Sequence, residues 1–241
     1  MRFIIVCMCV VGLLGLCACA WAGVSGPLTV KATSAGKSAT WTYNWVPGVM
    51  SYQLGAPIEL RTSDNTLVGK VNSLNCAMGS DPFLTLNFAV QAVGNTNFTF
   101  DSGLLIFAPI SPAEAFATAA TTLTADGGGA TFTGNFAGNN AYEATYNFGS
   151  VFADLNTTFS APPNTSATEN DRLPASGFGP IAGPVVTMRT QWNFNLTDGD
   201  GASGTSRFEL QPAVPDANTL SLAFAGAAPL LAGIIRRRRR A

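Results

Sequence analysis

Apolar and polar residues alternate along most of the central part of the chain. The even positions of 84–92 are apolar, and polar residues mostly fill the odd ones. The same alternation occurs in 142–148 and 186–196, with a shorter example in 41–45. A period of two is typical of strands that bury one face and expose the other. These segments therefore predict half-buried β-strands.

Short clusters of Gly, Asn and Asp separate the alternating segments. They occur at 63–65, 94–95, 126–129, 138–140 and 198–201. Such residues favour tight turns and positive φ. Many short strands separated by turns predict an all-β fold, namely an antiparallel β-sandwich that resembles a jelly roll. The 191 residues of 23–213 suit one domain of this kind.

Two segments depart from this pattern. Ser111-Pro112-Ala113-Glu114 has the residue order of a helix capping box, so 111–120 is predicted as either a short helix or a strand. The segment 161–174 is polar and contains proline, and it is predicted as a long loop or linker.

The first 22 residues have the pattern of a signal peptide. Arg2 precedes the apolar run 3–16, and Ala20 and Ala22 form a small-x-small site. This pattern predicts cleavage by signal peptidase before Gly23. An uncleaved membrane helix and a lipoprotein modified at Cys19 are the alternatives.

Cysteine usage agrees with export without disulfides. The leader holds four of the five cysteines, which leaves only Cys76 in the domain. One cysteine cannot form an internal disulfide, so we expect Cys76 to be a buried, inert thiol. A disulfide between two chains is the alternative.

The last 28 residues, 214–241, form a separate three-part segment. The uncharged run 219–235 would span about 25 Å as a helix, which is short but sufficient for a bilayer. It predicts a transmembrane helix whose cationic end stays in the cytoplasm. The apolar run argues against a nucleic-acid-binding tail. The cationic end consists of Arg236, Arg237, Arg238, Arg239 and Arg240.

This segment resembles the PEP-CTERM class of bacterial sorting signals. Val214 and Pro215 match the usual motif, whereas Asp216 and Ala217 depart from it and are closer to a variant that begins Val-Pro-Asp. The resemblance implies recognition and cleavage by an exosortase-like membrane protease. A permanent C-terminal anchor is the alternative.

Charge and composition exclude several functions. Residues 23–213 contain seven basic and thirteen acidic residues, which gives a net charge of −6. An acidic domain lacks the basic surface that nucleic acids require. The whole chain lacks histidine, which excludes Ser-His-Asp and Cys-His catalysis and most zinc sites. We therefore expect no enzyme and propose no catalytic residues.

Few residues suggest a ligand site. Asp198 and Asp200, in a Gly-rich turn, are weak calcium candidates, although the residues that follow do not complete a calcium loop. The acidic pairs Glu143 with Asp154 and Glu169 with Asp171 would serve a hydrolase only if they flanked a cleft. Otherwise these acidic residues are surface charges.

The aromatic residues of the first strands have two interpretations. Trp41, Tyr43, Trp45 and Trp192 have the spacing of core residues, but aromatic rings can also stack on sugars. Tyr52 lies outside the strongest alternation and is expected to be the most exposed of them.

These observations predict an exported protein of the cell surface or extracellular matrix. As the resemblance implies, it would be a structural or adhesive component of an exopolysaccharide biofilm matrix. The alternative is a lectin-like module that binds exopolysaccharide, assisted by calcium at Asp198 and Asp200. An exported hydrolase is the third hypothesis.

Overall fold

A computed structural model describes residues 22–213 of the chain. The predictions for Ala20, for the motif 214–217, for the membrane span 219–235 and for the arginines 236–240 lie outside the described residues. Within 22–213, no helix is long and apolar enough to cross a membrane. The one helical element among these described residues is a 3-10 turn, η1, at Ala137–Asn139.

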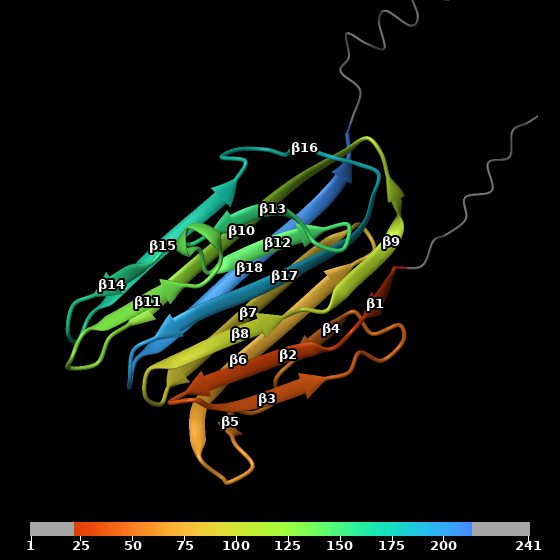
Figure 1. The fold of residues 1–241 in the computed structure, drawn as a ribbon. Coiled ribbons are helices and arrows are strands. Elements are labelled where there is room, and N and C mark those ends of the chain that lie inside the picture. Colours follow the sequence, from red (N-terminus) through yellow and green to blue (C-terminus); the bar gives the residue numbers. More distant parts are fainter. Residues whose placement is uncertain (1–21, 214–241) are drawn as a thin grey trace, which may run out of the picture.

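The described residues form two antiparallel sheets (Figure 1). The first, sheet A, has ten strands, and the second, sheet B, has eight. Sheet A consists of β1 (Gly23–Ser25), β2 (Leu28–Ser34), β3 (Lys37–Tyr43), β8 (Thr96–Asp101), β9 (Leu104–Ile110), β11 (Ala130–Gly134), β12 (Tyr142–Tyr146), β13 (Ser150–Leu155), β14 (Phe159–Ala161) and β17 (Val185–Leu196). Sheet B consists of β4 (Ser51–Gln53), β5 (Ile58–Arg61), β6 (Leu67–Gly79), β7 (Phe83–Ala92), β10 (Ala113–Thr124), β15 (Ser166–Leu173), β16 (Gly179–Ile181) and β18 (Gly201–Pro212).

Strand β17 organises sheet A. One edge of β17 pairs with β9 and β8, and the other edge pairs with β12 and β11. From Met188 to its end, buried residues alternate strictly with more exposed ones, and Trp192, Phe194 and Leu196 are among the buried ones. The residues between them, Gln191, Asn193 and Asn195, face outward. The position of β17 therefore fixes which outward side chains become neighbours across the sheet.

The two sheets pack through a cluster of aromatic rings. Phe88 of sheet B stacks on Phe100 with ring centroids 4.4 Å apart, and its centroid lies 5.5 Å from that of Phe194. It also meets the edge of Trp192 at 5.2 Å. Gly204 lies opposite Phe88 on β18, where a Cβ atom would come within 2.4 Å of the ring. The glycine therefore makes room for the ring that joins the two sheets.

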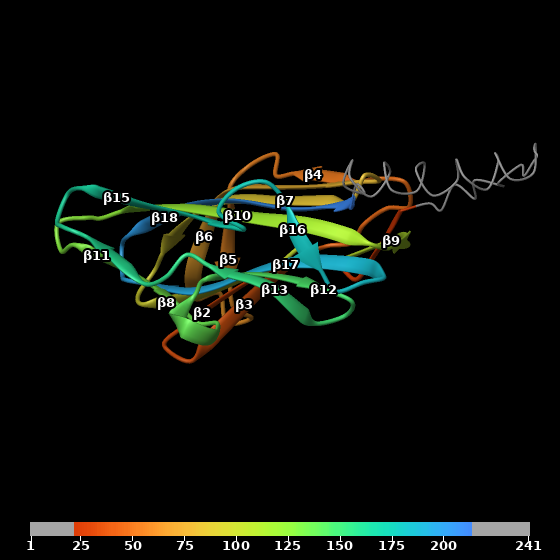
Figure 2. The ribbon, with the colours of Figure 1, turned by 90° about the horizontal axis from the view of Figure 1, so that it is seen from above.

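Both ends of the described chain lie at one end of the molecule, which we call the terminal end (Figures 1 and 2). Gly23 pairs with Ile106 of β9, and Pro212 pairs with Ala113 at the start of β10. The short Ser111-Pro112 turn connects β9 to β10, which brings the two chain ends to the same side. The opposite end, the distal end, holds the turns that carry Lys37, Asp64, Asp126, Asp198 and Asp200.

The all-β, antiparallel architecture is confirmed, and the sheets face each other as in a sandwich (Figure 2). The finer description as a jelly roll stays a prediction. Of the segment 111–120, residues 113–120 lie in strand β10, where alternate alanines pack into the core. This burial outweighs the preference of alanine for a helix.

The prediction of a loop over 161–174 is wrong. This segment contains β15, which pairs with β10 over 117–124. Strand β15 lies at the edge of sheet B, and none of its residues is fully buried. An edge strand exposed in this way needs no apolar face, so its sequence lacks the hydrophobic alternation of the inner strands.

Cys76 is free and fully buried on β6, as expected. Burial raises the pKa of its thiol to about 12. The thiol therefore stays protonated, and so unreactive, at neutral pH.

Trp192→Ala should lower the free energy of unfolding by about 3–5 kcal/mol, because it removes a fully buried ring from the contact between the sheets. The indole also donates a hydrogen bond to Ser206 Oγ at 3.2 Å. Urea unfolding followed by circular dichroism measures the loss. Trp41→Ala, at a half-buried position on edge strand β3, is the matched control and should cost less than half as much. Equal losses would contradict the central role of Trp192.

Candidate functional site

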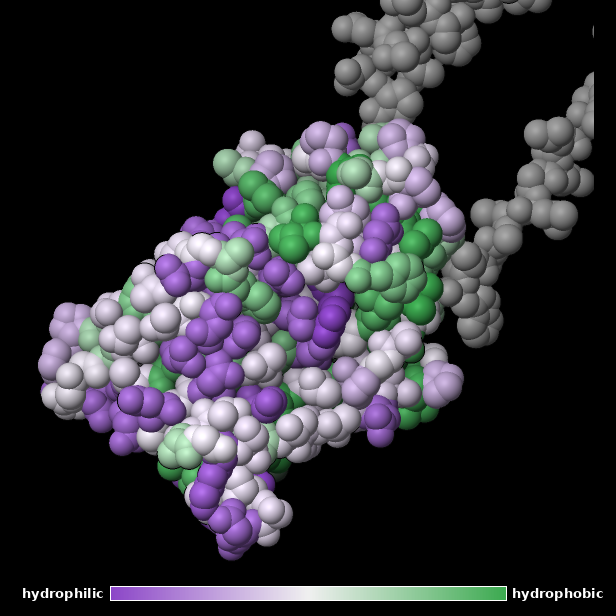
Figure 3. Space-filling view, in the orientation of Figure 1, coloured by the Kyte–Doolittle hydropathy of each residue, from purple (hydrophilic) through white to green (hydrophobic). Residues whose placement is uncertain are grey.

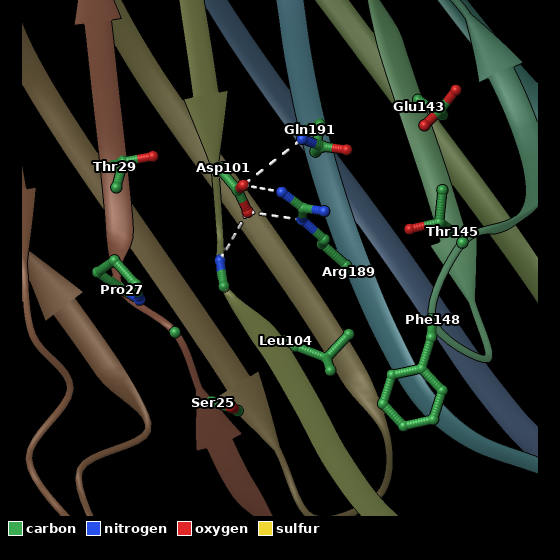
Figure 4. A pocket seen from close by; sticks show the side chains of 13 residues that line it. Ser25, Pro27, Thr29, Asp101, Leu104, Glu143, Thr145, Phe148, Arg189 and Gln191 are labelled. Atoms are coloured by element: carbon green, nitrogen blue, oxygen red, sulfur yellow. Dashed lines mark hydrogen bonds and ion pairs between the residues drawn. The ribbon is translucent and has the colours of Figure 1, made fainter. Parts of the chain in front are cut away.

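A groove of about 450 Å³ opens on the outer face of sheet A. Strands β1, β2, β8, β9, β12 and β17 and the β12–β13 turn contribute its lining (Figure 4). Charged and amide side chains lie along one part of it, and Leu104 and Phe148 give it an apolar part.

The polar lining comes from a row of residues that crosses five strands. The register places each residue directly opposite the next, so all of them point outward from the same face. In order from β2 to β13, the row consists of Thr29, Asp101, Gln191, Glu143 and Asp154. Because successive side chains of a strand point to opposite faces, the burial of the core residues also determines which residues form this outward row.

Arg189 and Asp101 form the fixed charged pair of the groove. Arg189 Nε donates to Asp101 Oδ1 at 2.8 Å, and its Nη2 donates to Asp101 Oδ2. The Gly103 amide also donates to Asp101 Oδ1, at 3.0 Å. The hydrogen bond to Asp101 raises the pKa of Arg189, which keeps the guanidinium charged. Because both oxygens of Asp101 accept hydrogen bonds, this carboxylate orients Arg189 and is poorly placed to act as a base.

Glu143 and Asp154 lie opposite each other on β12 and β13. Partial burial raises the pKa of Glu143, and the charge of Asp154 raises it further, although Arg189 opposes both effects. Burial also raises the pKa of Asp154, whose Oδ1 is buried without a hydrogen-bond partner in the described residues. The structure thus brings one acidic pair together at the edge of the groove.

An exposed aromatic ring borders the apolar part of the groove (Figure 4). Phe148 is 74% exposed and sits in the β12–β13 turn at φ 66°. A non-glycine residue seldom adopts this left-handed conformation. It is held by a hydrogen bond from the Phe148 amide to Thr187 Oγ1 at 3.1 Å, and by Asn147, whose side-chain amide donates to the Pro184 carbonyl at 2.9 Å. These bonds fix the backbone of the turn, from which the ring extends into solvent.

Amide side chains continue the polar surface toward the distal end. Asn193 Oδ1 accepts from Asn97 Nδ2 at 2.9 Å and from Asn135 Nδ2 at 3.2 Å. Asn195 Nδ2 donates to Asn135 Oδ1 at 2.9 Å. Hydrophilic residues accordingly cover the middle of this face (Figure 3). The amide and guanidinium groups of this face are hydrogen-bond donors, and the amide oxygens are acceptors.

The two calcium candidates lie at the distal end and serve as hydrogen-bond acceptors. Asp198 Oδ1 accepts from the Gly94 amide at 2.6 Å, and Asp200 Oδ1 accepts from the Asp126 amide at 2.9 Å. Asp200 is almost fully buried. Among residues 22–213, no group of three or more acidic, Cys or His residues is arranged to hold a metal ion. These carboxylates fasten the β7–β8 and β10–β11 turns to the β17–β18 turn.

The other predicted residues lie apart from the groove. Glu169 and Asp171 face inward from β15, where Thr157 Oγ1 and the Asn156 amide donate to them at 2.7 Å. They do not share a cleft with Glu143. Trp192 is a core residue, as its spacing predicts.

The aromatic residues near the start of the chain form a half-buried cluster between β3 and β4. Tyr52 is half-buried, as are Trp41, Tyr43 and Trp45. Its ring packs 4.3 Å from that of Tyr43 and 5.3 Å from that of Trp41. Tyr52 and its partners therefore cover the open edge between the sheets.

Sequence reasoning missed most of the groove. Asp101 and Arg189 are 88 positions apart, so only the pairing of β8 with β17 brings them together. The alternation over 142–148 predicts Phe148 to be the last apolar residue of a strand, but it lies in the turn after β12. The neighbouring Asn147 and Gly149 are the sequence signal that indicates this turn.

Glu143→Gln should raise the free energy of unfolding at pH 7. Because folding raises the pKa of Glu143, the folded state binds its proton more tightly than the unfolded state does. The protonated Glu143 therefore contributes stability below the pKa that it has in the unfolded chain. This contribution is lost as pH rises through the higher pKa that it has in the folded protein. The gain in the free energy of unfolding should vanish at about pH 3, where the Glu143 carboxyl is protonated in both the folded and the unfolded state.

Urea unfolding at a series of pH values tests this expectation. Glu59→Gln is the control, since Glu59 is exposed and paired with Arg61 at 2.7 Å. That substitution should not stabilise the protein at pH 7. An unchanged or lower stability of Glu143→Gln would contradict the assignment.

Comparison with known proteins gives no family for this chain. No protein-family model and no curated protein matches it. Two solved structures match over 67% of the chain: the enzymatically active domain of bacteriophage CBA120 tailspike protein 4, at 14% identity and a TM-score of 0.29, and an arabinose-bound α-L-arabinofuranosidase, at 13% identity and a TM-score of 0.26. The matches cover 19% and 23% of those chains, so this chain spans about a fifth of their length. TM-scores this low do not indicate a shared overall fold and carry no information about function.

Proposed function

We propose that this protein is an exported component of the cell surface or extracellular matrix that adheres to polysaccharide through the groove on sheet A. The observation that carries the proposal is the combination of the exposed Phe148 ring with the Arg189–Asp101 pair in one open groove. We also propose that the β-sandwich has a jelly-roll-like arrangement of strands.

The groove suits a polymer better than a small molecule. It is open to solvent on a broad sheet face, and the amide side chains of Asn193 and Asn195 continue the polar surface beyond it along β17. A chain of sugar units can use such repeated groups along its length. Phe148 provides an apolar surface on which one sugar ring can stack, and hydrogen bonds fix the backbone of its turn.

Charge narrows the class of polysaccharide. The groove contains two carboxylates, Asp101 and Glu143, against one guanidinium, and the domain carries a net charge of −6. Like charges repel an anionic polymer before contact. The proposed ligand is therefore a neutral or amino-substituted polysaccharide. A polymer rich in uronic acids should bind more weakly.

Calcium is not part of this proposal for the groove. About nine residues of extended chain, roughly 30 Å, separate Arg189 from Asp198 along β17 and its following turn. An ion bound by Asp198 and Asp200 would lie too far away to touch a sugar in the groove. A calcium-assisted lectin would need a second site at the distal end.

Export and sorting rest on the sequence of the two ends. The signal-peptide pattern of 1–22 and the tail 214–241 support passage across the membrane, with an exosortase-like protease as the processing enzyme. The shared location of Gly23 and Pro212 at the terminal end supports the same scheme. A domain held from that end would leave the face of sheet A free for matrix polymers.

Phe148→Ala should weaken binding to a neutral polysaccharide by about tenfold, which corresponds to about 1.4 kcal/mol. Glycan-array screening identifies a ligand, and isothermal titration with an oligosaccharide of it measures the affinity. Leu173→Ala removes another exposed apolar side chain, on β15 of the other sheet, and is the matched control. Equal affinity of Phe148→Ala and wild type would contradict the proposed site, and the absence of any glycan ligand would contradict the proposed function.

The intact mass of the protein in membrane and medium fractions of its host tests export and sorting. We expect a species that begins at Gly23 and ends near Val214, because both ends are predicted to be removed. A species found only in membranes that still carries Arg236–Arg240 would contradict processing and would indicate a permanent anchor.

A further inference from the structure

The loop between β3 and β4, residues 44–50, forms an uncharged apolar surface at the terminal end of the molecule. Val46 is 55% exposed and Val49 is 38% exposed. No charged residue occurs from Ser38 to Ile58. The loop and residues 22–24 enclose a hollow of about 390 Å³ that is lined mainly by apolar side chains. Surface hydrophobic residues that cluster in this way mark a contact with a partner.

The loop is rigid. The Val49 amide donates to the Val46 carbonyl at 2.9 Å, and Gly48 has φ 82°, as in a type II turn with Pro47 before it. Trp45 Nε1 donates to the Ser102 carbonyl at 3.2 Å, and the Met78 amide donates to the Met50 carbonyl at 2.8 Å. Both valines are therefore held outward by bonds to the body of the domain.

The position of the loop identifies the partner. It lies at the end where the described chain begins and ends (Figures 1 and 2). The predicted membrane span starts at Thr219, six residues after Ala213, and six extended residues reach at most about 20 Å. A chain anchored by that span must keep its terminal end close to the bilayer. The polar turns of the distal end then face away from it.

We infer that the 44–50 loop contacts the lipid bilayer surface while the protein is anchored, an inference that rests on the membrane anchor of the proposed function. Valine side chains enter the apolar region, and tryptophan is favoured at the boundary between lipid and water. Because the loop has no cationic residue, the contact does not need anionic lipid. The hydrophobic surface that gathers toward the terminal end agrees with this orientation (Figure 3).

A fluorescent label that responds to polarity tests the contact. The full chain is used with Cys7, Cys9, Cys17 and Cys19 changed to serine, and the buried Cys76 thiol, with its raised pKa, stays unlabelled at neutral pH. Val46→Cys receives the nitrobenzoxadiazole label, and the chain is reconstituted into phosphatidylcholine vesicles. The matched control is Asn95→Cys, at an exposed position of the β7–β8 turn at the distal end.

We expect the label at position 46 to shift its emission to the blue and to be quenched by a spin-labelled lipid. The label at position 95 should keep the emission that it has in water. Aqueous emission from position 46, in chains that float with the vesicles, would overturn the inference. Chains that fail to float would overturn the anchor and this contact together, while leaving the glycan groove untouched.

A blue shift that appears without vesicles and grows with protein concentration would assign the loop to a contact between two copies, which also overturns the inference. Val49→Asn in the labelled Val46→Cys chain gives an independent reading. It should reduce the quenching by the spin-labelled lipid, because it places a polar group beside the label in the same turn.

Discussion

The packing of Phe88 against the aromatic residues of sheet A is the contact on which the rest of the structure depends. One ring of sheet B touches Phe100, Phe194 and Trp192, which come from two adjacent strands. Gly204 must leave space for that ring, and Ser206, two residues along the same strand, accepts the hydrogen bond of the Trp192 indole. A slip of β17 by one residue would turn the rings of Trp192 and Phe194 toward water. The core therefore fixes the register of β17 and with it the outward face of sheet A.

The groove follows from that register and needs no separate scaffold. Once Trp192 and Phe194 point inward, Gln191 and Asn193 must point outward, and their neighbours on β8 and β12 must do the same. Arg189 then lies beside Asp101 on the outward face of the sheet. The sheet holds the polar groups at fixed spacing, and only Phe148 depends on a turn. In many binding proteins, likewise, a rigid sheet holds some of the side chains of a site and loops supply the others.

The sequence predicts the strands well where one face is buried, because burial imposes a period of two, as in β7, β12 and β17. It fails for β15, since an exposed edge strand is under no such constraint. It leaves 111–120 ambiguous, because the capping-box order and the alanines favour a helix, whereas Thr118 favours a strand. The groove could not be read from the chain, since its charged pair depends on strands that meet only after folding. The sequence shows Glu143 and Asp154 as a pair of nearby acidic residues. Only the β12–β13 hairpin places the two side chains opposite each other on one face of the sheet.

The central position of β18 has a mechanical consequence for a protein held by its C-terminal end. A pull on Ala213 acts along the axis of β18, which is bonded to β10 over its whole length and to β7 over 201–209. Such a load shears many hydrogen bonds at once, whereas a load on an edge strand would open them one after another. Forced unfolding is governed by the unfolding rate, so this geometry favours a domain that resists a pull on Ala213.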